Sequence, residues 1–204
     1  MNQVTSVEQL RGIYGEPRTA AAHKVIDHVD ENAAAFIQRS PFLLIATAGA
    51  GGQLDVSPKG DLAGFVQVAD KQTVLIPDRP GNNRIDGLQN IVETGRIGLL
   101  CLVPGVKETM RINGSAHVSV DPELLGRFVV DGKPPKSVTV VAVEELFFHC
   151  ARALIRSYLW DPERQIERSE LPSMGTILAA HTNGLVDQCE YDEALPTRIM
   201  ESLY

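Results

Sequence analysis

The stretch from Phe42 to Asp78 constrains the fold most, because it holds four short apolar runs joined by very short turns. PFLLIATAGAGGQLDVSPKGD is an apolar run, a Gly-rich turn and a second run, and GFVQV and TVLIP follow with only four residues between them. Both pairs are typical of β-hairpins. Hairpin links require antiparallel pairing, since parallel strands need a crossover of a dozen or more residues. The sequence shows no βαβ repeat, which disfavours a doubly wound nucleotide-binding fold.

Helical patterns flank and interrupt these strands. Ser6 and Gln9 have capping-box spacing at the start of a short helix, and a second helical region runs from about Thr19 to Ser40, with Asp30 as a candidate internal N-cap. Pro77 ends the fourth strand, and a helix that starts at the Asn-Asn-Arg run follows, with Gly95 as its expected C-cap. Three further strands are predicted, over residues 96–103, 108–120 (with a bulge near Gly114) and 137–148.

This order predicts a mainly β, α+β fold: a six-stranded antiparallel barrel, closed or half-closed, with flanking helices. The chain has 204 residues, enough for one sizeable core, and we predict a single domain over residues 1–204. Its parts are a helical N-terminal segment (1–40), the barrel (42–148) and a helical C-terminal segment (149–204).

Composition excludes several classes of function. The net charge of -7 argues against non-specific binding to nucleic acid and against docking on an anionic membrane. The N-terminus lacks the basic and apolar regions of a signal peptide, and no apolar stretch is long enough to span a bilayer. The three cysteines are widely spaced and the histidines scattered, so we expect free thiols, no metal site and a cytoplasmic location.

Asn82, Asn83 and Arg84 are the first candidate binding residues. A helix N-terminus offers unpaired N–H groups and about half a positive charge, and an arginine fork suits phosphate oxygens. The alternative is structural, because asparagine commonly caps helices and an arginine in a first turn is commonly solvated. Ser57 and Lys59 share one face of a strand, and both readings stay open for them as well.

Two later segments carry further candidates. Thr109 and Arg111 alternate with apolar residues on the long strand, so Arg111 is either a ligand or a solvated outer residue. His149 follows two aromatic residues, and Arg152 and Arg156 lie on one helix face.

Three segments, taken in order, resemble the pyridoxamine 5'-phosphate oxidase-like flavoproteins, in particular a bacterial subgroup of probable FMN-dependent enzymes. The segments are SPKGD, IPDRPGNNRIDGLQNI and IGLL-x-LVPG-x-x-ET-x-R-I-NG. The resemblance covers about Phe42 to Ala116 and extends more loosely to FFHCARALIRS. It implies a Greek-key split β-barrel that forms a homodimer, with FMN in two symmetric grooves at the subunit interface. It also implies an FMN-dependent oxidoreductase that acts on a small molecule.

The resemblance implies a role for each candidate. Residues near the flavin ring and ribityl chain are Ser57, Lys59, Pro77 and Asp78, and the phosphate-binding element is Asn83 and Arg84. The long strand of the partner subunit supplies Thr109 and Arg111 to the phosphate, while His149 and Arg156 match an aromatic and a late arginine of the family loosely. The flavin carries the redox chemistry itself, so we expect no catalytic dyad.

Two departures from the family pattern limit the substrate. Oxidases that act on pyridoxamine phosphate have a Ser-Arg-Lys type motif where this chain has Asn-Asn-Arg, and an Arg-x-His pair that ARALIRSYLW lacks. Two alternatives therefore stand beside the oxidoreductase: a flavin-binding protein without turnover, or a relative that binds haem or the deazaflavin F420 in the same groove.

Overall fold

The computed structural model describes residues 3–204, so residues 1 and 2 of the predicted N-terminal segment lie outside the described part. Three helices precede the strands: α1 (Val7–Tyr14), α2 (Thr19–His23) and α3 (Glu31–Arg39). Asp30 caps α3 as predicted, because its carboxylate accepts from the Ala33 N–H at 2.8 Å. Ser6 likewise caps α1, whereas the Gln9 side chain returns to the N–H of Thr5.

Seven antiparallel strands form one sheet in the order β2-β1-β5-β6-β7-β4-β3, which confirms the predicted fold class. The strands are β1 (Phe42–Ala48), β2 (Leu54–Gly60), β3 (Gln67–Asp70), β4 (Thr73–Asp78), β5 (Arg96–Leu102), β6 (Thr109–Ser119) and β7 (Ser137–His149). The predicted count of six was one too low, because all seven strand patterns found in the sequence join the sheet. The sheet curls so that β2 approaches β4, where Lys59 pairs with Asp78 across the split between them.

Alternation along the strands separates two faces of the sheet. Leu43 and Ile45 of β1 point inward and are almost fully buried, together with side chains such as Met110 and Ile112 of β6. Each fully buried aliphatic side chain contributes about 1.5–3 kcal/mol relative to exposure. Helix α3 and helix α4 (Asp86–Thr94) add Ile37 and Ile91 to the same core.

Part of the outward face, on β1 and β2, is also apolar. On β2, Leu54 is 81% exposed and Val56 is 62% exposed, and Phe42 lies on the same face of neighbouring β1. An antiparallel sheet with one solvated face normally places polar residues there. This chain therefore presents apolar side chains to the outside of its sheet.

The bulge predicted near Gly114 is present, but its extra residue lies in β7. Pairing shifts from Asn113↔Glu145 to Gly114↔Val143, which leaves Glu144 as the additional residue. A Cβ on Gly114 would stand 1.9 Å from the main-chain oxygen of Ala142, so the two strands approach there as only glycine allows. The sequence did not indicate that β7 carries the extra residue, because β7 has a continuous apolar pattern.

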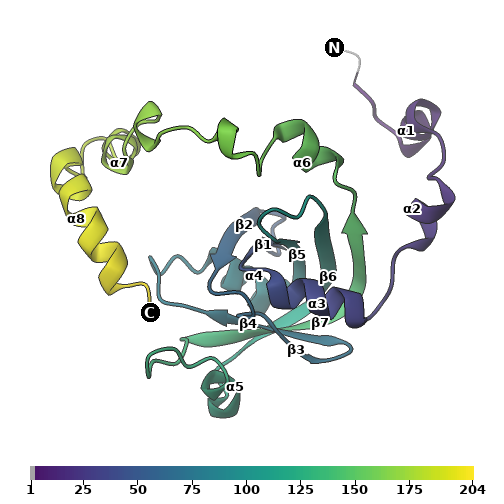
Figure 1. Cartoon of the computed structure of the whole chain (residues 1–204), viewed down its shortest axis with the longest axis horizontal. Helices are drawn as coiled ribbons and strands as arrows, with labels where there is room; N and C mark the ends of the chain where they lie inside the picture. Colours follow the sequence, from purple (N-terminus) through teal and green to yellow (C-terminus); the bar gives the residue numbers. More distant parts are fainter. Residues whose placement is uncertain (1–2) are drawn as a thin grey trace.

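Helix α5 (Pro122–Gly126) follows its N-cap Asp121, whose carboxylate accepts from the Glu123 N–H, and packs on β7 over a small second core. Beyond β7 the chain forms α6 (Arg152–Ser157), two short 3-10 helices (Pro162–Arg164 and Arg168–Glu170), α7 (Met174–His181) and α8 (Gln188–Glu201). Figure 1 shows this segment as an arc that runs away from the barrel and returns to it at the C-terminal end, with α1 and α2 extended on the other side. Among residues 3–204, no helix combines the length and apolarity needed to cross a membrane.

The surface area reflects this open shape. The single chain exposes 13764 Å². A compact monomer of 22.2 kDa is expected to expose about 9,400 Å². The excess is roughly 4,400 Å², and the terminal segments that extend from the barrel contribute to it.

Candidate functional site

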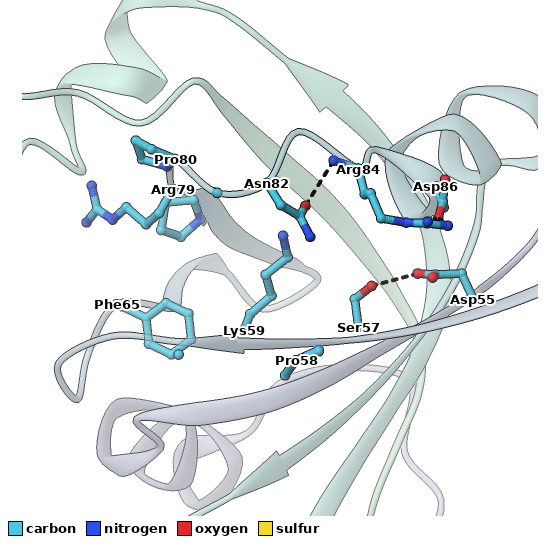
Figure 2. Close-up of a pocket in the computed structure, with 13 residues that line it drawn as sticks. Asp55, Ser57, Pro58, Lys59, Phe65, Arg79, Pro80, Asn82, Arg84 and Asp86 are labelled. Atoms are coloured by element: carbon cyan, nitrogen blue, oxygen red, sulfur yellow. Dashed lines mark hydrogen bonds and ion pairs between the residues drawn. The ribbon is translucent and has the colours of Figure 1, made fainter. Parts of the chain in front are cut away.

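A groove of about 430 Å³ lies between β2 and the turn that follows β4. One wall is the inward face of β2, and the other is the turn from Arg79 to Arg84 with the start of α4 (Figure 2). Its volume is within the usual range for small-molecule sites. The residues that line it are Asp55, Ser57, Pro58, Lys59, Gly60, Phe65, Pro77, Arg79, Pro80, Gly81, Asn82, Arg84 and Asp86.

The β2 wall presents three polar side chains at every second position. Asp55, Ser57 and Lys59 pair with the inward residues Thr47, Ile45 and Leu43 of β1, so all three face the barrel interior. Ser57 Oγ donates to Asp55 Oδ2 at 2.8 Å. Lys59 donates to Asp78, which places its ammonium group in the split of the barrel.

The turn wall is built from asparagine and arginine. Asn82 Oδ1 accepts from the main-chain N–H of Arg84 at 3.0 Å (Figure 2). Asn83 has φ +59°, a left-handed conformation that asparagine adopts more readily than most residues. Its Oδ1 accepts from Lys136 Nζ at 2.7 Å. These bonds fix the chain just before α4.

The helix begins later than predicted. Its first residue is Asp86 and its N-cap is Ile85, which has no polar side chain, so neither asparagine caps the helix. Asparagine was expected there because it is a favoured N-cap, but the side chains serve the turn instead. The first N–H groups of α4 are therefore left without a side-chain cap at the edge of the groove.

Every cation in the groove already has a carboxylate partner. Lys59 pairs with Asp78, and Arg84 Nη2 lies 2.6 Å from Asp86 Oδ2. The hydrogen bond and charge of Asp86 raise the pKa of Arg84 above its ordinary value. Arg79 lies on the far side of the turn and pairs with Asp61 at 2.9 Å. An anion that enters the groove must therefore compete with Asp86 for the Arg84 fork.

A second group of cations lies elsewhere, around Phe147. The Arg111 guanidinium carbon is 4.3 Å from the Phe147 ring centre, and Lys24 Nζ is 4.5 Å from it. The His149 ring is 4.9 Å from the same ring. Burial lowers the pKa of His149, and the charges of Lys24 and Arg111 lower it further. Arg111 Nε is buried without a hydrogen-bond partner among residues 3–204.

The family of the chain follows from comparison with known proteins. The model of the pyridoxamine 5'-phosphate oxidase family matches residues 29–150, which is more than half of the chain. The chain belongs to the pyridoxamine 5'-phosphate oxidase family. None of the curated proteins matches it significantly.

Solved structures are similar to this family member over about three fifths of its length. HupZ of Group A Streptococcus is 18% identical and aligns over 59% of this chain and 93% of its own, with a TM-score of 0.48. An FMN-binding protein of Syntrophomonas wolfei is 16% identical over 59% of this chain and 85% of its own, with a TM-score of 0.43. An F420 reductase is 16% identical and aligns over 59% of this chain and 98% of its own, with a TM-score of 0.42.

In this member of the oxidase family, nine of the ten residues expected at the cofactor fall into two groups. Ser57, Lys59, Pro77, Asp78 and Arg84 line the groove or the small adjoining cavity, and Asn83 lies in the turn beside them. Thr109, Arg111 and His149 gather at the other end of β7, where Thr109 pairs with His149. Arg156 is exposed on α6.

The two groups do not meet within one chain. Lys136, which contacts Asn83, immediately precedes the first residue of β7, and His149 is its last residue. Thirteen residues of extended chain separate these ends, which corresponds to roughly 40 Å along the strand.

Several residues of this family member's groove were not expected from the sequence. Asp55 continues the two-residue alternation of Ser57 and Lys59, so the strand pattern alone could have identified it. Asp86 was visible as the acidic residue in the first turn of a helix. Outside the groove, Lys24 reaches Phe147 and Tyr204 reaches Asp61 from distant segments, and no local pattern indicates either contact.

Proposed function

We propose that this chain is an FMN-binding flavoprotein, and an FMN-dependent oxidoreductase that acts on a small molecule. The observation that carries the proposal is the groove itself: Ser57 and Lys59 on β2 face the turn of Asn82 and Arg84 across one cavity. One wall thus offers donors to a planar heterocycle, and the other offers donors to a phosphate.

The donor set fits the cofactor. FMN supplies hydride or electron transfer when it is bound. Lys59 would donate to the N1/C2=O edge of the ring, where reduction builds negative charge, and its ammonium group would stabilise that charge. Arg84, once released from Asp86, would bind phosphate oxygens with its planar fork, aided by the uncapped N–H groups of α4.

We further propose that a second copy of the chain completes the site. Lys24 and Arg111 form no ion pair among residues 3–204, so their charges are free to meet an anionic ligand. They lie at the opposite end of β7 from Arg84 and cannot reach the same phosphate in cis. A homodimer would also cover exposed apolar side chains of the outer sheet face, such as Leu54 and Val56.

Pyridoxamine phosphate is not the substrate that we propose. Arg84 is the single cation of the Asn82–Arg84 turn, and its charge is already offset by Asp86. The C-terminal segment supplies no Arg-x-His pair to grip a second phosphate ester. The groove therefore supports binding of the flavin and leaves the substrate to be identified.

The test is cofactor binding by the purified full-length protein. FMN should bind more tightly than riboflavin, because only FMN carries the phosphate, and more tightly than FAD, whose adenylate needs room beyond the turn. Absorbance spectra after purification distinguish flavin from haem and from F420. Tight binding of FAD without affinity for FMN would contradict the proposal, and bound FMN that accepts no electrons from a panel of reductants would favour a flavin-binding protein without turnover.

A further inference from the structure

The end of the C-terminal arc docks on the back of the turn that forms the groove wall. Tyr204 Oη donates to Asp61 Oδ1 at 2.7 Å, and the Tyr204 ring centre lies 5.4 Å from the guanidinium carbon of Arg79. Lys133 Nζ donates to the main-chain oxygen of Tyr204 at 3.0 Å. Three separate parts of the chain thus hold this one residue.

Asp61 transmits this contact to Arg79. Its second oxygen accepts from Arg79 Nε at 2.9 Å, while Arg79 Nη1 donates to the main-chain oxygen of Phe128 at 2.7 Å. The Asp61 side chain is only 4% exposed and that of Arg79 is 16% exposed. Burial alone would raise the pKa of Asp61, but hydrogen bonds from Tyr204, the Leu62 N–H and Arg79 lower it overall, so the carboxylate is charged.

Arg79 is also the first residue of the turn that faces the groove. Figure 2 shows its side chain reaching away from Lys59 and Asn82. On that far side, a second hollow of about 530 Å³ is lined by Tyr204 and Leu203 of the arc, and it shares Gly60, Arg79 and Pro80 with the groove. The docked arc and a ligand in the groove therefore contact opposite sides of one turn.

We propose that Tyr204 is a positioning residue for the groove: by docking on Asp61 and Arg79 it holds the turn from Arg79 to Arg84 in the conformation that binds the ligand. The ligand part of this inference rests on the proposed FMN function. Between α6 and Tyr204 the arc extends away from the barrel (Figure 1), so its docking is expected to open and close locally. Coupling is reciprocal, and FMN should strengthen docking by the factor by which docking strengthens FMN binding.

The test compares Tyr204→Phe with Tyr191→Phe in the full chain. The first variant removes only the hydroxyl group that donates a hydrogen bond to Asp61. The second variant is the control, because Tyr191 lies on α8 with its ring centre 4.3 Å from the guanidinium carbon of Arg198 of the same helix. In ligand-free protein, amide hydrogen exchange over residues 81–84 should be faster in Tyr204→Phe and unchanged in Tyr191→Phe. The Kd for FMN should rise about fivefold in Tyr204→Phe alone, the lower end of usual coupling between sites. FMN should slow exchange at residues 199–204 of the wild type.

Unchanged exchange over residues 81–84 in Tyr204→Phe would overturn the inference, including the case in which that variant merely melts at a lower temperature. Equal Kd values for FMN in both variants would overturn it as well. If the wild type binds no FMN, the proposed function fails, and the comparison of exchange in ligand-free protein still decides whether Tyr204 positions the turn.

Discussion

At the scale of single residues, Arg84 stands between two acceptors. It is exposed and paired with Asp86, and a phosphate in the groove would compete for the same fork. Arg84→Ala should weaken FMN about ten- to a hundredfold, the range for losing a charge-assisted contact, and should change riboflavin affinity little. Titration of flavin fluorescence measures both. Arg96→Ala is the matched control, because Arg96 also forms an exposed ion pair, with Glu144. Equal losses for FMN and riboflavin would return Arg84 to a structural role.

Replacement of Asp86 is predicted to have the opposite effect on FMN affinity. Asp86→Asn removes the charge that holds the Arg84 fork, so FMN should bind about two- to fivefold more tightly, in line with the small strength of exposed ion pairs. Riboflavin affinity should not change, because no phosphate is present to use the released fork. Weaker FMN binding in Asp86→Asn would show that the carboxylate supports the site instead of competing with the phosphate.

His149 predicts a dependence of stability on pH. Its pKa is lowered in the folded chain by burial and by the charges of Lys24 and Arg111. The unfolded chain therefore binds more protons as the pH falls through the ordinary histidine pKa of about 6.5, and stability falls in that window. Urea midpoints at pH 5 and pH 7 should differ less in His149→Gln than in the wild type. His181→Gln, on α7, should keep the wild-type difference, and an unchanged difference in His149→Gln would refute the assignment.

At the scale of elements, the contact of β6 with β7 depends on Gly114. Gly114→Ala would drive a Cβ into the main chain at Ala142, so the strands must separate at the bulge. We expect a loss of about 2 kcal/mol or more, and a fall in Tm of roughly 2–4 °C for each kcal/mol. Thermal unfolding followed by circular dichroism measures it. In Gly126→Ala the added Cβ meets nothing within 4 Å, so a similar loss there would show that the effect is not specific to the bulge.

Most elements could be predicted from local signals in the sequence. Asp30 and Asp121 cap helices as their residue types favour, Gly95 ends α4 with φ +65°, and both hairpins follow from their turns. The start of α4 could not be predicted, since its N-cap Ile85 goes against the usual preference. The bulge residue Glu144 was missed because a strand pattern does not show which partner carries the extra residue.

Local signals in the sequence also indicated part of the candidate groove. Ser57, Lys59 and Arg84 belong to short motifs, and the structure brings them to one groove. Contacts between distant segments could not be predicted: Asp61 and Tyr204 are 143 residues apart and meet only in the folded chain. Local periodicity carries no information on such contacts.

At the scale of the whole molecule, the single chain has three features that a second copy would explain. Its terminal segments extend from the barrel (Figure 1), and its outer sheet face exposes Leu54 and Val56. Lys24 and Arg111, which form no ion pair among residues 3–204, lie far from its groove. A second copy would address all three features at once. The proposed dimer and the proposed flavin site are then one object, in which Arg84 of each chain shares a phosphate with Arg111 of the other.

Complementation between two damaged subunits tests this claim most directly. Arg84→Ala and Arg111→Ala chains with different affinity tags are co-expressed, and the heterodimer is isolated by both tags. Each parent homodimer has two grooves with one lost arginine, whereas the heterodimer has one intact groove and one that lacks both. The measurement is the amount of FMN bound per chain. Sharing of the site across the dimer predicts recovery toward half a flavin per chain in the heterodimer, and occupancy equal to the mean of the two parents would contradict it.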